Sequence, residues 1–264
     1  MKTSWIVVAV LAVGATFSAR SSSDAELTDR IVGYLRPRCG GNHIRDEREP
    51  ELIEVLDIQG DTNRLARLLA ELAHTNDNWN ASMALWQLEK YGTSEQLPCL
   101  YSLVTNPVVG VRAVKAILHI EGVTSNSLSA VQSYISVTNG FPLMNSDNRS
   151  NLCRDVVKTV FADNALSPHR TAIFDIACGF ARDVNVLPKG LDKTLIDVEP
   201  GYRFSKRRLA ILRSAQTRLN EKFQAMDTND AHFESESHVY EVQTNFLMSA
   251  INELVAYPEA DLPD

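Results

Sequence analysis

The strongest constraint on the fold of this chain is a pattern of apolar residues that occurs twice, 32 positions apart, within residues 65–122. Eight apolar residues of the first copy each correspond to an apolar residue of the second. The pairs are Leu65/Leu97, Leu68/Leu100, Leu69/Tyr101, Leu72/Val104, Ala81/Ala113, Ala84/Ala116, Leu85/Ile117 and Leu88/Ile120. Two neighbouring copies indicate that residues 97–122 are one unit of a repeated architecture.

Within each copy, the apolar residues have the spacing of a helix that buries one face. Residues 65, 68, 69 and 72 follow the spacing i, i+3, i+4 and i+7, and the second half of the copy does the same. The letters HTNDN and TNPV lie between the halves, and Asn, Asp and Pro favour turns and helix starts. Each copy is therefore predicted to be a helical hairpin. A single hairpin leaves apolar surface exposed to water, so such units are expected to stack.

The second copy resembles the HEAT repeat, a helical hairpin from which α-solenoids are built. The features that carry the resemblance are Leu97-Pro98, the Asn106-Pro107 turn, Val111-Arg112 and the terminal Gly122. The first copy diverges, since Trp79 and Asn80 stand at the Val-Arg positions and Thr75 stands at the Pro position. Over residues 61–122 the resemblance implies a right-handed α-solenoid. Two generic hairpins without a solenoid are the alternative.

Helical patterns continue on both sides of the two copies, and strand patterns are nearly absent, so the predicted fold class is all-α. Further helices are expected at residues 26–35, 50–58, 128–135, 152–160, 168–182, 203–223 and 239–255. Two other segments interrupt the pattern. They are a long insertion at residues 183–202 and an exposed acidic loop at residues 225–238.

The first residues have the layout of a secretory signal peptide. Lys2 gives a positive start, an apolar run covers residues 5–17, and small residues follow. This run is shorter than the roughly 20 residues that span a bilayer. An uncleaved anchor or a buried first helix is the alternative. A secreted or periplasmic protein is expected, with no integral membrane span after signal cleavage.

The predicted organisation of the chain therefore has four parts. They are a signal peptide at residues 1–19, an N-terminal helical cap at 20–60, HEAT-like repeats at 61–140, and divergent helical repeats at 141–264 that include the insertion.

Four cysteines, Cys39, Cys99, Cys153 and Cys178, allow three disulfide pairings in an oxidising compartment, and the sequence does not choose among them. The last three lie within apolar helical patterns, where a Cys behaves as a small buried hydrophobic residue. At least two free, buried thiols are expected.

The net charge and the sequence motifs limit the classes of function that the chain can have. The formal net charge of -7 argues against a protein whose main partner is nucleic acid, because that role needs clustered Lys and Arg. The six histidines are scattered, and no phosphate-binding loop or nucleophile motif occurs. No metal site, cofactor or catalytic residue is predicted.

The strongest local anomaly is a basic face on the helix expected at residues 203–223. At 100° per residue, five cations lie opposite the apolar side of this helix. They are Arg203, Lys206, Arg207, Arg213 and Arg218. Such a face can bind carboxylates or phosphates of a partner. The alternative is a solvated face that pairs with nearby acids such as Asp192, Asp197 and Glu199.

These observations predict an exported, HEAT-like scaffold that binds a protein or peptide partner and is not a catalyst. A partner that uses the basic face is expected to be acidic. The turns at residues 76–78 and 106–108 are the next candidate surfaces. One alternative is an enzyme on a helical scaffold, a hydrolase or lyase that acts on an anionic polymer through residues 183–202. A structural component of the cell envelope is another.

Overall fold

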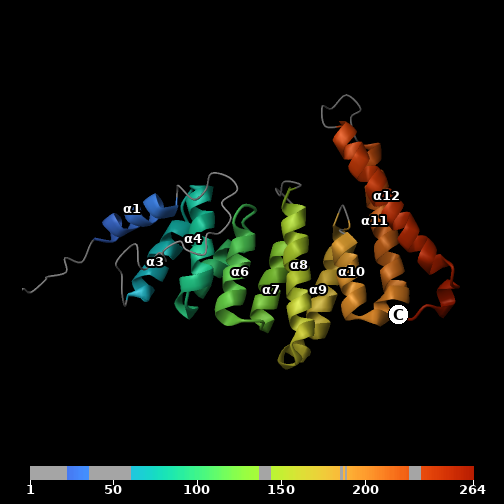
Figure 1. The fold of residues 1–264 in the computed structure, drawn as a ribbon, viewed down its shortest axis with the longest axis horizontal. Coiled ribbons are helices and arrows are strands. Elements are labelled where there is room, and N and C mark those ends of the chain that lie inside the picture. The colour runs from blue at the N-terminus through green and yellow to red at the C-terminus, as the bar shows by residue number, and fades with distance from the viewer. Residues whose placement is uncertain (1–22, 36–60, 137–143, 185–186, 188, 226–232) are drawn as a thin grey trace, which may run out of the picture. The chain divides into compact units, whose positions relative to one another are not determined.

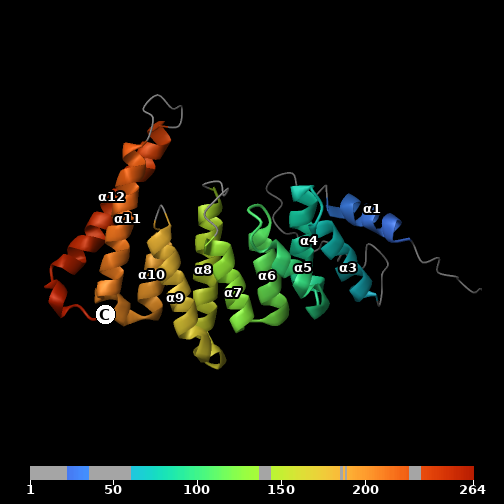
Figure 2. The same cartoon turned by 180° about the vertical axis from the view of Figure 1, so that it is seen from behind.

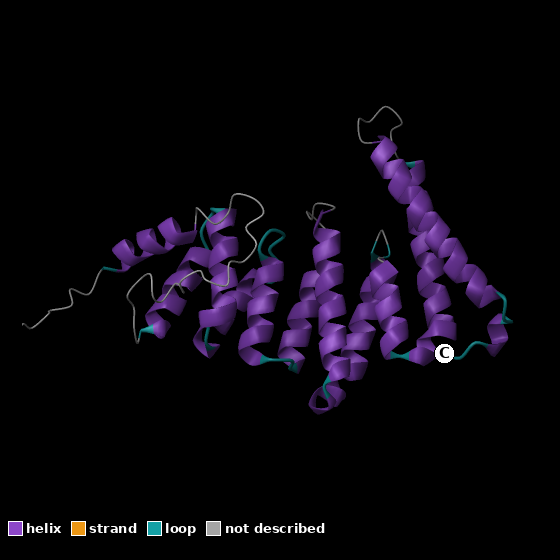
Figure 3. Ribbon diagram, in the orientation of Figure 1, coloured by secondary structure: helices purple, strands orange, loops and turns teal. Residues whose placement is uncertain are grey.

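A computed structural model describes residues 23–35, 61–136, 144–184, 187, 189–225 and 233–264. All regular structure in these ranges is helical, and no strand occurs among them (Figure 3). The predicted all-α class is therefore confirmed. The chain divides into two compact units, Met1–Asp57 and Ile58–Asp264.

The first unit contributes one described helix, α1 (Asp24–Leu35), which matches the helix expected at residues 26–35. The second unit contains the other helices. They are α3 (Thr62–Ala73), α4 (Asn78–Tyr91), α5 (Leu97–Leu103), α6 (Gly110–Glu121), α7 (Ser125–Ser136), α8 (Met144–Ala162), α9 (Arg170–Asp183), α10 (Lys189–Val198), α11 (Lys206–Gln224) and α12 (Phe233–Val255).

Helices of the second unit contact partners that are close in the sequence. The hairpin α3/α4 contacts the hairpin α5/α6 through α4 and α6, and α6 contacts α7. Farther along, α8 packs against α9 and α10, α9 against α11, and α11 against α12. Figures 1 and 2 show these helices side by side in chain order. Each helix thus buries its apolar face against near neighbours.

Side-chain caps explain where the two helices of the first hairpin, α3 and α4, begin. Asp61 accepts a hydrogen bond from the backbone N–H of Arg64 at the start of α3. Asp77 accepts from the N–H groups of Trp79 and Asn80 at the start of α4. These bonds satisfy amides that have no partner within the helix. The predicted capping is therefore confirmed in the turn of the first hairpin. In the turn of the second, Asn106 accepts from two backbone N–H groups, but α6 itself has no side-chain cap.

The repeated apolar pattern forms the core of the two hairpins. All eight residues of the first copy are buried. In the second copy Leu97, Tyr101 and Ile120 are half-buried, and the other five residues are buried. The stripes read from the sequence are therefore the faces that the helices turn inward.

Three helix boundaries differ from those expected. Helix α8 begins at Met144 instead of near residue 152, and α12 begins at Phe233, inside the segment expected as an acidic loop. Helix α11 begins at Lys206, and Arg203 lies in a preceding 3-10 helix, Pro200–Phe204. Ser205 separates the two helices and caps α11 by accepting a hydrogen bond from the backbone N–H of Arg208.

The segment 183–202 is not simply an insertion, because it contains helix α10. Leu191 and Leu195 of α10 are fully buried, and the helix packs against α8 and α9. Two leucines four residues apart give one apolar face, which is enough for a short helix between neighbours. The segment is part of the packed structure.

Several predictions concern residues outside the described ranges. These are the signal peptide at residues 1–19, the helix at residues 50–58 and the state of Cys39. None of the helices in the described parts of the chain is both long and apolar enough to cross a membrane.

Candidate functional site

The five cations of the predicted basic face do not form one open face in the structure. Arg207 and Arg218 interact with α9 and the residue that follows it. Arg203, Lys206 and Arg213 interact with α12 and the residues after it. Each of the five has a partner within the chain, so the two groups are described separately.

Arg207 and Arg218 form the group on the α9 side. The Arg207 guanidinium pairs with the Asp175 carboxylate at 2.8 Å and lies over the Phe174 ring, 5.5 Å from its centroid. Arg218 donates from Nε to the backbone oxygen of Val184 at 3.3 Å. These contacts attach α11 to α9.

Arg203, Lys206 and Arg213 form the group on the C-terminal side, which we call the basic surface. Each pairs with a carboxylate that lies far away in the sequence. The pairs are Arg203–Glu253 at 2.6 Å, Lys206–Asp264 at 3.2 Å and Arg213–Glu259 at 3.1 Å. About half of each cationic side chain remains exposed to solvent.

The acids that pair with these cations are not the ones expected. The sequence suggested Asp192, Asp197 and Glu199 as partners. Asp197 instead accepts from Lys193 one turn earlier on α10, and Asp192 pairs with a cation outside the predicted face. That cation is Arg208.

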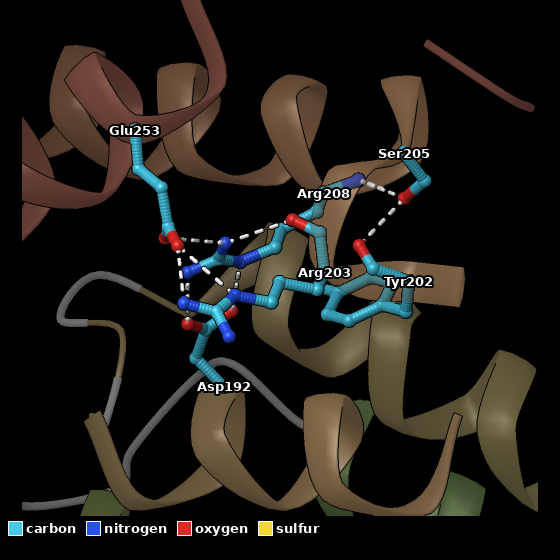
Figure 4. A network of polar contacts seen from close by, with 6 residues as sticks. All are labelled: Asp192, Tyr202, Arg203, Ser205, Arg208 and Glu253. Carbon is cyan, nitrogen blue, oxygen red and sulfur yellow. Dashed lines mark hydrogen bonds and ion pairs between the residues drawn. The ribbon is translucent and has the colours of Figure 1, made fainter. Parts of the chain in front are cut away.

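Arg208 is the centre of a buried polar network that joins three helices (Figure 4). Its Nε and Nη2 atoms donate to the two carboxylate oxygens of Asp192 at 3.1 and 2.9 Å. Its Nη1 atom donates to the backbone oxygen of Arg203 at 2.9 Å and to Glu253 at 3.3 Å. Arg208 and Asp192 are each 3% exposed. The network therefore connects α10, α11 and α12, with the Arg208–Asp192 pair in the interior and Glu253 partly exposed.

Burial and charge pairing shift the pKa values of this network in different directions. Burial acts to raise the pKa of Glu253, but hydrogen bonds from Arg203 and Arg208 hold it below its ordinary value. Burial raises the pKa of Tyr202, whose ring lies beside the network in Figure 4. Tyr202 is 3% exposed, and its hydroxyl has no hydrogen-bond partner among the described residues. Tyr202 and Asp192 are thus enclosed, which does not suit contact with a large substrate.

The sequence did contain a signal for Arg208. At 100° per residue this arginine falls in the middle of the apolar side of α11, between the directions of Leu212 and Ala215. A charged residue on a buried face needs a buried partner of opposite charge. The position therefore indicates a buried ion pair, although the partner cannot be read from the same pattern.

A cavity of about 530 Å³ lies between α7, α8 and α9. Its apolar lining includes Ile135 and Phe180, and Arg149 borders it with its guanidinium 5.8 Å from the centroid of the Phe180 ring. Asp175 also lines the cavity, and a Cβ atom on Gly179 would meet open space there. The volume suits a small ligand or a partner side chain. The lining carries charges of both signs, which favours no single class of ligand.

Three of the four cysteines are described, and all three are free thiols. Cys153 and Cys178 are buried, which confirms the expectation of at least two free, buried thiols. Burial raises the pKa of each of these two thiols to about 12. Neither is suited to act as a nucleophile at neutral pH.

Comparisons of the chain with protein families, with curated proteins and with solved structures found no match. Within the part of the chain that the structure describes, no group of three or more His, Cys, Asp or Glu residues could hold a metal ion.

Proposed function

We propose that this protein is an exported binding scaffold, an α-solenoid of HEAT-like hairpins that is not a catalyst and that holds an acidic segment of a protein partner. The observation that carries the proposal is the basic surface, where three half-exposed cations each hold a carboxylate. A surface that already binds three carboxylates in this arrangement has the chemistry to bind those of a partner.

The energetics of these ion pairs favour exchange. Exposed ion pairs contribute about 0–1 kcal/mol each to stability, because water screens them. A partner carboxylate can therefore replace an internal one with little loss. Arg203, Lys206 and Arg213 are fixed on a short segment that the Arg208 network holds in place, so the cations are arranged before a partner binds.

The packing of the helices supports the solenoid part of the proposal. Consecutive hairpins contact each other through their second helices, α4 and α6, and the small residues Ala81, Ala84, Ala113 and Ala116 on these helices are buried. Such units present extended surfaces made of many helix faces, and these surfaces typically bind other proteins. Export is supported by the signal-peptide pattern of residues 1–19.

The alternative of an enzyme acting on an anionic polymer has less support. It requires catalytic groups from residues 183–202 to reach a large substrate. Asp192 and Tyr202 are buried in that segment, and Asp192 is bonded to Arg208. Lys193 and Asp197, which are exposed, pair with each other.

Partner capture with matched variants tests the proposal. The mature chain would be immobilised and exposed to the native extracellular or periplasmic fraction, alongside a variant with Arg203, Lys206 and Arg213 changed to Ala. The control changes three other exposed, paired cations, Arg67, Arg182 and Lys193, to Ala. Cross-linking with mass spectrometry would locate the captured contact.

The expected result is a protein that the native chain and the control retain, that the basic-surface variant loses, and that cross-links through an acidic segment. Retention should decrease as salt concentration rises. Equal retention by all three chains, or cross-links that lie elsewhere, would overturn the proposal.

A further inference from the structure

The residues that follow α12 fold back onto the start of α11. We call residues 256–264, with the sequence AYPEADLPD, the C-terminal segment. The backbone N–H of Lys206 donates to the backbone oxygen of Pro263 at 2.8 Å. Figures 1 and 2 show the C-terminus beside the lower end of α11, where this helix begins.

Two carboxylates of the basic surface come from the C-terminal segment. Glu259 pairs with Arg213, and Asp264 pairs with Lys206. Only the partner of Arg203, Glu253, lies within α12 itself. The segment therefore pairs with two of the three cations of the surface that the proposed function assigns to a partner.

Apolar contacts hold the segment at two further points. Leu262 is only 4% exposed, although the residues on both sides of it are exposed. The ring of Tyr257 meets that of Phe204 edge-on, with centroids 5.3 Å apart. Because exposed ion pairs contribute little, the burial of Leu262 is expected to provide most of the binding energy.

We infer that the C-terminal segment is an intramolecular ligand of the basic surface, and that the partner segment shares its chemistry: carboxylates placed around a buried leucine. The inference rests on the proposed function. The tether gives the segment a high effective concentration at the surface, so a partner must displace it in order to bind. The segment thus sets both the kind of partner and the affinity that the partner needs.

A labelled synthetic peptide copying residues 256–264 tests this inference on full-length chains by fluorescence anisotropy. The native chain should bind the peptide weakly, because its own segment occupies the surface. Leu262→Asp should release that segment and increase peptide affinity at least tenfold. Val255→Asp is the matched control, since it adds the same carboxylate at an exposed residue nearby and should leave affinity at the native level.

Specific recognition is checked by reversing one ion pair. Adding Arg213→Glu to the Leu262→Asp chain should weaken binding of the native peptide several-fold, since an exposed ion pair is replaced by repulsion. A peptide with Glu259→Arg should then recover binding to this double variant. A peptide with Leu262→Asp should not bind any of the chains, because it lacks the apolar anchor.

A second variant covers the case in which Leu262→Asp disturbs the fold, which circular dichroism would detect. Glu259→Lys with Asp264→Lys changes only exposed side chains and should weaken the attachment of the segment by repulsion from Arg213 and Lys206. This chain should also bind the native peptide more tightly than the native chain does. If both released variants bound the peptide as weakly as the native chain does, the inference would be overturned.

Failure of the inference can be told apart from failure of the proposed function. If partner capture depends on the basic surface but neither released variant binds peptide or captures more partner, only the inference is wrong. If capture does not depend on the basic surface, the proposed function is wrong. A native chain that forms dimers by exchanging C-terminal segments would overturn the intramolecular arrangement, and sedimentation analysis would show it.

Discussion

The guanidinium of Arg208 donates two hydrogen bonds to the carboxylate of Asp192, and both residues are almost entirely buried. The pair joins the start of α11 to α10. Glu253 of α12 accepts a further hydrogen bond from the same guanidinium, and it also accepts from Arg203 of the basic surface. The proposed binding surface therefore rests directly on a buried ionic network.

Removing one member of the buried pair should destabilise the protein strongly. Asp192→Ala leaves the Arg208 cation buried without its main counter-ion, and such changes cost about 3–5 kcal/mol. Replacing both residues, by Asp192→Leu with Arg208→Met, should cost less, because no buried charge is left over. The free energy of unfolding would be measured by urea denaturation.

An exposed ion pair provides the control for that experiment. Lys193→Ala breaks the pair with Asp197 on the surface of α10 and should change the free energy of unfolding by less than about 1 kcal/mol. If Asp192→Ala lowered the free energy of unfolding as little as Lys193→Ala, the buried network would not be a main support of the fold.

Stability should depend on pH through Glu253. The folded-state pKa of this carboxyl lies below its ordinary value of 4.5. The stability that the ionised Glu253 carboxylate contributes to the fold is therefore fully present above about pH 4.5. It is lost as the pH falls through the lower, folded-state pKa. Glu253→Gln should destabilise the chain at pH 7, and the difference from the native chain should shrink toward pH 3.

The measurement is the urea midpoint of both chains between pH 3 and pH 7. Glu71→Gln serves as a control for loss of one carboxylate, since Glu71 pairs with Arg67 on an exposed helix face. If the difference in urea midpoint between the native and Glu253→Gln chains stayed constant down to pH 3, stability would not depend on the ionisation of Glu253.

Two helical glycines, one at the start of α6 and one within α9, should respond in opposite ways to replacement by Ala. A Cβ atom on Gly110 of α6 would clash with the backbone oxygen of Val104 and would lie 2.9 Å from a ring carbon of Tyr134. Gly110→Ala should therefore destabilise the chain by about 1–3 kcal/mol. A Cβ atom on Gly179 of α9 meets nothing within 4 Å, so Gly179→Ala should stabilise it by about 0.5–1 kcal/mol. Thermal unfolding followed by circular dichroism would show shifts of opposite sign, and two shifts of the same sign would contradict this packing.

The two hairpins of residues 62–121 were predictable because the sequence features that specify them lie close together in the chain. Each helix there has a regular apolar stripe and an Asp, Asn or Pro at its start, and both features act within a few residues. Helix α10 has only 10 residues and prolines lie close to both of its ends, so its apolar residues at 191, 195 and 198 do not by themselves distinguish a helix from a loop. Its helical state depends on packing against α8 and α9, which the local sequence does not report. The solenoid arrangement itself stays a prediction.

The candidate site was predictable only in part, for a related reason. The cations of residues 203–218 could be found from helical periodicity alone. The partners of Arg203, Lys206 and Arg213 could not be found in this way, because these carboxylates lie about 50 positions away and approach only when α12 packs against α11. The number of residues between two charged side chains does not show whether they will pair in the folded protein. The buried position of Arg208 was visible, but its partner Asp192 depends on where α10 lies.

The described cysteines should differ sharply in their reactivity with iodoacetamide. Burial raises the pKa of Cys153 and of Cys178 to about 12, so both thiols stay protonated at pH 8, and access to both is blocked. Cys99 is half-buried, so that reagent can reach it, although burial also raises the pKa of its thiol. In the native protein at pH 8 we expect alkylation of Cys99 within hours and none of Cys153 or Cys178, measured by mass spectrometry of tryptic peptides. Urea should make all three react at similar rates. Rapid alkylation of Cys153 or Cys178 without urea would show that the packing between α8 and α9 opens readily.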